Sequence, residues 1–163
     1  MPASSAATKD STLIESFLRP ALFIPSLHSR KKPAVLEELL QALVLTGVTK
    51  DPGAVLDLLL QREGMGSTGI GKGVAVPHAR STLIYDRAVV FGRSVRGVDF
   101  DSADEGPAHL IFLTVAPPSD SDPVYLQLLA EIVRGVRLAK TRQKLLDAPD
   151  FASVQEILVH AAE

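Results

Sequence analysis

The stretch HLIFLTVAPP at residues 109–118 is the most apolar run of the chain, and it predicts a β-strand. Residues 110–115 are rich in the branched and aromatic side chains that favour strands, and two prolines end the run. A second segment of the same kind, residues 88–95, precedes it. The run is much shorter than the roughly 18 residues that a membrane span requires. We therefore expect two strands of a sheet and no direct membrane insertion.

Helices flank these strands along the chain. Apolar residues recur at helical spacing in several segments, with proline, aspartate or glycine at their ends. The predicted helices are 33–46, begun by Pro33 and closed by Gly47; 52–62, begun by Pro52 and capped by Asp51; 124–138; about 140–147; and 151–162, capped by Asp150. A short helix is expected over 13–18, an edge strand containing Pro25 over 22–27, and an extended segment over 74–76 that stops at Pro77-His78.

Strands mixed with flanking helices predict a layered α/β domain. The order and the direction of the strands stay open, because no local signal determines them. Residues 1–11 are small and polar and are predicted to be a loose N-terminal arm, which leaves a single domain over residues 12–163.

Composition and charge exclude several classes of protein. The 163 residues include 46% hydrophobic and 22% charged residues, an ordinary mix for one globular domain. The formal net charge of −2 argues against a nucleic-acid binder, which would need a basic stripe. There are no cysteines, so disulfides, thiol catalysis and cysteine-ligated zinc are excluded. The N-terminus lacks the basic and apolar regions of a secretory signal, and we expect a cytoplasmic protein.

The segment REGMGSTGIGKGVAVPHAR, residues 62–80, carries five glycines between positions 64 and 73. Backbone N–H groups in such a loop can form a concave nest for an anion, although a flexible connector is the simpler interpretation. Residues 66–72 fit the first seven positions of the Walker nucleotide-binding pattern. Gly73 stands where that pattern requires Ser or Thr, and Pro77 opposes the helix that should follow. A nucleotide site is therefore not expected.

Histidine supplies the candidate reactive group. His78 follows a rigid proline directly after the glycine-rich loop, and Arg62 precedes the loop. A neutral imidazole can act as a nucleophile near pH 7, and N–H donors and an arginine can stabilise an incoming phosphoryl group. A structural role for His78 is the alternative.

Other catalytic chemistries find no support in the sequence. The remaining histidines, at positions 28, 109 and 160, are interpreted as structural or surface residues. No histidine pair has the spacing of a metal site, so we expect no metal and no cofactor. Ser67 lies outside any nucleophile-elbow motif and has no identifiable base, which argues against a serine hydrolase.

The sequence GSTGIGKGVAVPHA at residues 66–79, with Arg62-Glu63 upstream, resembles the active-site signature of the enzyme IIA family of the bacterial phosphotransferase system. The similarity is to the fructose/mannitol class, also called EIIA type 2, which includes the nitrogen-regulatory members. It extends over roughly residues 12–160 and includes the segments LLLQRE, GVDF, HLIFLTVAPP and YLQLLAEI. The resemblance implies a three-layer α/β/α sandwich with a mixed central sheet of about five strands.

The resemblance also implies a phosphotransfer role. His78 would accept a phosphoryl group from a phosphohistidine on the carrier protein HPr or on its nitrogen-branch counterpart. The group would then pass to a sugar-specific IIB component, or the protein would regulate a transporter or a kinase. Arg62 corresponds to the family's active-site arginine. The phosphoryl-binding residues implied are Ser67, Thr68, Gly69, Gly71 and Tyr125.

One position departs from the family pattern. Members usually carry a second histidine at the start of the late helix, and here the corresponding residue is Tyr125. Tyrosine can donate a hydrogen bond to a phosphoryl oxygen, but it does not carry a positive charge at pH 7. Two functions therefore stay open: a phosphoryl carrier, and a non-phosphorylated interaction module on the same scaffold.

Overall fold

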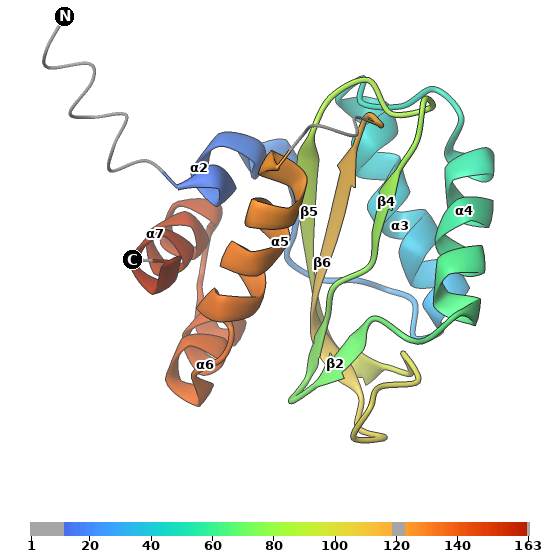
Figure 1. Ribbon diagram of the computed structural model, residues 1–163. Coiled ribbons are helices and arrows are strands. Elements are labelled where there is room, and N and C mark those ends of the chain that lie inside the picture. Colours follow the sequence, from blue (N-terminus) through green and yellow to red (C-terminus); the bar gives the residue numbers. More distant parts are fainter. Residues whose placement is uncertain (1–11, 119–122, 163) are drawn as a thin grey trace, which may run out of the picture.

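The computed structural model describes residues 12–118 and 123–162, which fold as an α/β sandwich (Figure 1). The helices are α2 (Leu13–Phe17), the 3-10 turn η1 (Pro20–Leu22), α3 (Lys32–Leu45), α4 (Pro52–Gly64), α5 (Val124–Gly135), α6 (Ala139–Asp147) and α7 (Phe151–Ala162). The strands are β1 (Phe23–Ile24), β2 (Gly69–Gly71), β3 (Val74–Ala75), β4 (His78–Arg80), β5 (Ala88–Val98) and β6 (Ala108–Ala116).

The two long strands β5 and β6 form the centre of the sheet and run antiparallel. On one side β1 pairs with β5 in parallel and forms the edge. On the other side β3 and β4 both pair in parallel with β6, and β2 is antiparallel to β3. The sheet is therefore mixed, as expected, and has six strands.

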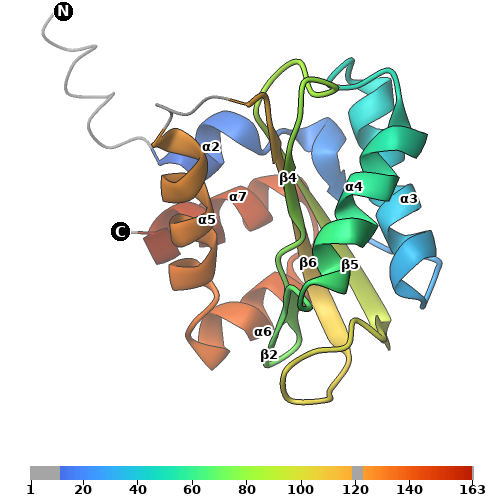
Figure 2. The same cartoon turned by 45° about the vertical axis from the view of Figure 1, so that its right-hand side comes forward.

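Helices cover both faces of the sheet (Figures 1 and 2). Helices α3 and α4 pack on one face, against β5 and β4, and α2, α5, α6 and α7 lie on the other. Paired residues Phe91 of β5 and Phe112 of β6 stack in the fully buried interior, with ring centroids 4.4 Å apart. This arrangement confirms the three-layer α/β/α prediction.

The predicted helices are confirmed, several with their caps. The Asp51 carboxylate accepts from the Ala54 N–H at the start of α4, and the Asp150 carboxylate accepts from the Ser153 N–H at the start of α7. Gly47, with φ +76°, follows the end of α3 in the left-handed conformation that closes a helix. Helix α5 ends at Gly135, three residues earlier than predicted.

The predictions differ from the structure mainly around the glycine-rich loop. Residues 69–71 form strand β2, which the glycine content did not suggest. The extended segment predicted to stop at Pro77-His78 forms β3 up to Ala75, and a further strand, β4, begins at His78. Strand β4 forms because β6 continues as a parallel partner beside it. The arm predicted at residues 1–11 lies outside the described residues. Within the described ranges, no helix combines the length and the apolar character needed to cross a membrane.

Candidate functional site

His78 lies at the first position of β4, half-buried, in register with Thr114 of β6. Its Nδ1 is 2.8 Å from the carbonyl oxygen of Val76. Because a carbonyl oxygen can only accept, Nδ1 carries the proton in this bond. In the neutral ring the unshared electron pair is then on Nε2. The local backbone therefore selects the tautomer in which Nε2 is the nucleophilic nitrogen.

Tyr125, in the first turn of α5, comes to His78 from the other side of the site. The two ring centroids are 6.1 Å apart, and Tyr125 is only 4% exposed. Burial raises the pKa of its hydroxyl above the ordinary value, and the positive charges of Arg80 and Arg62 only partly oppose this effect. The hydroxyl is thus neutral at physiological pH and available as a hydrogen-bond donor.

Arg80 is an additional cation of the site and is not among the predicted site residues. It stands two positions after His78 in β4, so both side chains project from the same face of the strand. Its guanidinium carbon lies 5.0 Å from the centroid of the Tyr125 ring. The sequence could have indicated Arg80 through the two-residue alternation of a strand, but only if residues 78–80 had been predicted as a strand.

Arg62 reaches the site from the last turn of α4, the helix that packs against β4. Its Nη1 donates to the Gly66 carbonyl oxygen at 2.9 Å. Its positive charge lowers the pKa of the Tyr125 hydroxyl and so opposes the larger effect of burial. The structure thus brings His78 and Tyr125 together, and it brings the helix that carries Arg62 to the strand that carries His78.

The predicted loop residues have different surroundings. The Ser67 hydroxyl donates to the carbonyl oxygen of Phe100 and accepts from the Gly69 N–H at 3.0 Å. The Thr68 N–H and hydroxyl both donate to the carboxylate of Glu63. At Thr68 and Gly69 the N–H groups are thus satisfied within the chain. A phosphoryl-binding role of Ser67, Thr68, Gly69 and Gly71 stays a prediction.

Two of the loop glycines are required by local geometry. A Cβ on Gly69 would collide with Ser102 Oγ and would lie 3.0 Å from the Ser102 Cα, tighter than nearly all real Cβ contacts. Gly71 has φ +89°, a conformation that side chains strongly disfavour. A Cβ on Gly71 would also lie only 3.2 Å from the Asp104 carboxylate. Gly69 and Gly71 are therefore required by the packing and backbone conformation of β2 and the turn to β3, independently of any ligand.

Glu63 holds the glycine-rich loop through hydrogen bonds, and it is also not among the predicted site residues. Besides Thr68, it binds the Lys32 ammonium at 2.9 Å, and both side chains of this ion pair are buried. Lys32 also lies 3.5 Å from an Asp101 oxygen. The pair connects the start of α3 with the end of α4, next to Arg62.

The resulting site combines an imidazole with a free Nε2 lone pair, two guanidinium groups and a neutral phenol. Such a set can form a bond to an electrophilic, negatively charged group and compensate its charge. Among the described residues, no three histidine, aspartate or glutamate side chains cluster as a metal site would require.

Comparison with known proteins gives a consistent result. A family model described as "Phosphoenolpyruvate-dependent sugar phosphotransferase system, EIIA 2" matches residues 16–161. The fructose-specific EIIA component of Haloferax volcanii is 37% identical over 132 residues, which cover 81% of this chain and 85% of that protein. A nitrogen regulatory protein of Bradyrhizobium diazoefficiens is 34% identical over 146 residues, 89% of this chain and 94% of the relative.

Solved structures show the same fold. Nitrogen regulatory protein IIA-Ntr from Neisseria meningitidis superposes with a TM-score of 0.83 at 27% identity, covering 90% of this chain and 99% of that one. Enzyme IIA mannitol of Escherichia coli, solved in complex with phosphorylated enzyme IIB mannitol, gives a TM-score of 0.74 at 17% identity, covering 88% and 99%.

Proposed function

The chain belongs to the EIIA type 2 family of phosphoenolpyruvate-dependent sugar phosphotransferase systems, and we propose that it is a phosphoryl carrier with His78 as the acceptor. The observation that carries the proposal is the bond between His78 Nδ1 and the Val76 carbonyl oxygen, which leaves the lone pair on Nε2. A nucleophile is thereby prepared beside two arginines and a phenolic donor.

The proposed step is a transfer between two histidines. The Nε2 lone pair of His78 attacks the phosphorus atom of a phosphohistidine on a donor protein. The phosphorus–nitrogen bond of the donor breaks, and its electron pair returns to the donor ring. Arg62 and Arg80 balance the charge on the phosphoryl oxygens, and the Tyr125 hydroxyl donates to one of them. The Nδ1–H bond to Val76 stabilises the positive charge of the phosphorylated ring.

The partners proposed are proteins of the same system in the cytoplasm. The donor is HPr or its nitrogen-branch counterpart, and the acceptor is a IIB component or a regulated transporter or kinase. Exposed apolar side chains beside the site suit a protein partner: Met65 directly follows α4, and Leu126 directly follows Tyr125, with 79% and 64% of their surfaces exposed. A small-molecule donor would not require them.

A second candidate function is a non-phosphorylated interaction module. The observation that favours it is Tyr125, which provides no titratable base near pH 7 where related proteins usually carry histidine. The exposed side chains of Met65 and Leu126 would then bind a regulated partner protein, and no phosphoryl group would be transferred.

The test is incubation with a phosphorylated donor protein, followed by intact mass and peptide mapping at neutral or alkaline pH. The wild-type protein should gain one acid-labile phosphoryl group, and His78→Ala should gain none. Substitutions at the other three histidines should leave the gain unchanged. Label on His78→Ala would refute the assignment, and a wild-type protein that stays unmodified by several authentic donors would favour the module.

A further inference from the structure

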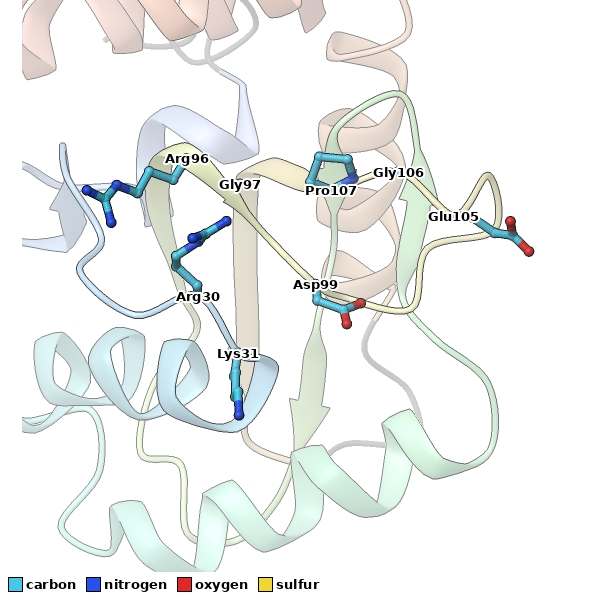
Figure 3. Close-up of a pocket in the computed structure, with 8 residues that line it drawn as sticks. All are labelled: Arg30, Lys31, Arg96, Gly97, Asp99, Glu105, Gly106 and Pro107. Atoms are coloured by element: carbon cyan, nitrogen blue, oxygen red, sulfur yellow. The ribbon is translucent and has the colours of Figure 1, made fainter.

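A hollow of about 680 Å³ opens at the end of the sheet away from His78. It borders Pro107, the residue before β6, whereas His78 pairs with Thr114 near the other end of that strand. Three cationic side chains line it: Arg30 and Lys31 from the loop before α3, and Arg96 from β5 (Figure 3). Its volume lies in the range of small-molecule sites.

The backbone that carries two of these cations is held by several hydrogen bonds. The Glu38 carboxylate of α3 accepts from the N–H groups of His28 and Ser29, at 3.0 and 2.6 Å. The carbonyl oxygen of Arg30 accepts from the N–H of Asp99 at 3.1 Å. The loop is therefore preorganised, which lowers the entropic cost of binding a ligand.

The three cations are not neutralised by neighbouring carboxylates. Within residues 12–118 and 123–162 both ion pairs involve Lys32, which is buried. Glu38 is used by backbone N–H groups, and the Glu105 side chain points away from the other labelled residues in Figure 3. In the same view Arg30 is directed toward Gly97 and the backbone of Arg96, whereas the Lys31 side chain extends in the opposite direction. Guanidinium groups in this setting suit the bidentate binding of a phosphate.

Asp99 indicates that the ligand also carries hydroxyl groups. Its carboxylate lies on the wall of the hollow, and one of its oxygens accepts from the Asp101 N–H. A carboxylate repels an isolated anion, but it is a good acceptor for the hydroxyl groups of a sugar ring. A wall with cations and one carboxylate therefore fits a molecule that is anionic at one end and hydroxylated at the other.

We propose that this hollow binds a phosphorylated sugar unit, either a free sugar phosphate or the ribose phosphate of a nucleotide. Arg30 and Arg96 bind the phosphate, and Asp99 accepts from the hydroxyl groups. The site is separate from His78 and does not depend on phosphotransfer.

The test is a titration of the full-length, 15N-labelled protein, followed by NMR. Ribose 5-phosphate and AMP distinguish the two sources of the phosphorylated sugar, and ribose and inorganic phosphate each supply one half of the chemistry. At least one of the first two should bind with a dissociation constant below about 1 mM and shift the amides of residues 28–31 and 96–99. The amides of residues 78–80 should not shift. No shift at 28–31 and 96–99 with either compound, or ribose binding as tightly as ribose 5-phosphate, would overturn the proposal.

Variants locate the two halves of the site. Arg30→Gln and Arg96→Gln should each weaken binding about tenfold, the effect of losing one charge-assisted hydrogen bond. Arg19→Gln is the matched control: it removes an exposed arginine that does not line the hollow and should leave the affinity unchanged. Asp99→Asn keeps an acceptor for the Asp101 N–H; it should weaken binding of the sugar phosphate without weakening that of inorganic phosphate. Equal losses in Arg19→Gln and Arg30→Gln would show nonspecific charge attraction and refute the site.

Discussion

At His78 a single backbone contact determines the chemistry of the ring. The Val76 carbonyl is two residues away in the chain, so the contact is local and forms wherever Pro77 holds the segment extended. What the local chain does not provide is positive charge. That charge comes from Arg62 on α4 and from Arg80 on the same strand as His78.

The two arginines should both be needed for transfer. Arg62→Ala and Arg80→Ala should each slow phosphorylation of His78 by about 10²-fold, the usual effect of removing one charge-stabilising donor. Arg62→Lys and Arg80→Lys should restore part of the rate, because a point charge replaces a planar guanidinium. Rates are measured by rapid quench with a phosphorylated donor. Arg19→Ala is the control and should transfer at the wild-type rate.

Tyr125 predicts a pH effect on stability. Its pKa is raised by burial, so the folded protein keeps the hydroxyl protonated where the unfolded chain, with a pKa of about 10, releases the proton. The stabilisation is complete below about pH 10 and is lost as the pH rises above that value. Between pH 9 and pH 11 the wild type should lose about 1 kcal/mol more unfolding free energy than Tyr125→Phe.

Urea unfolding at several pH values measures this difference. Tyr85→Phe is the matched control, since Tyr85 is the other tyrosine and is 56% exposed. It should follow the wild-type pH dependence. Identical profiles for wild type and Tyr125→Phe would show that the Tyr125 hydroxyl ionises equally easily in both states.

At the scale of secondary-structure elements, the Lys32–Glu63 pair connects α3, α4 and the loop before β2. Both side chains are buried, and Glu63 additionally accepts two bonds from Thr68. Removing one partner leaves the other charge buried and unpaired, which costs far more than the pair itself contributes. The position of Arg62 depends on the same helix end.

Glu63→Ala should therefore lower the free energy of unfolding by about 3 kcal/mol. Lys32→Met should have a similar effect, and the double variant Lys32→Met/Glu63→Leu should cost less than the two single changes together, because no charge is left unpaired. Urea unfolding provides the measurement. Glu37→Ala, on the exposed face of α3, should change stability by no more than about 0.5 kcal/mol. Additive losses in the double variant would contradict the coupling.

At the scale of the whole molecule, β5 and β6 hold the two helical layers together. Phe91 and Phe112 are paired across these strands, both are fully buried, and their rings are nearly parallel at 5°. Phe23 extends the stack from the edge strand, 5.5 Å from Phe91. The site residues are attached to this framework through β4 and β6.

Phe112→Ala should destabilise the entire domain by about 3–5 kcal/mol, through lost burial and the cavity left behind. Unfolding should remain a single transition, because one core serves all layers. Val95→Ala removes a side chain that is 85% exposed and should change stability by no more than about 0.5 kcal/mol. Chemical unfolding followed by circular dichroism and by NMR detects any separate transition, which would contradict a single cooperative core.

The amino-acid sequence by itself determined the helices, the two long strands and the α/β class, and it singled out His78 and Arg62 as the candidate reactive pair. These depend on local properties: the spacing of apolar residues, the capping residues, and a contiguous motif around the glycine-rich loop. Only the tertiary structure decided the strand order, the existence of β2 and β4, and the roles of Arg80 and Glu63. Short strands form because neighbouring strands complete their hydrogen bonds, and β4 exists only beside β6. Likewise, Arg80 contacts the Tyr125 ring and Glu63 pairs with Lys32 through packing between elements distant in sequence, which no local pattern encodes.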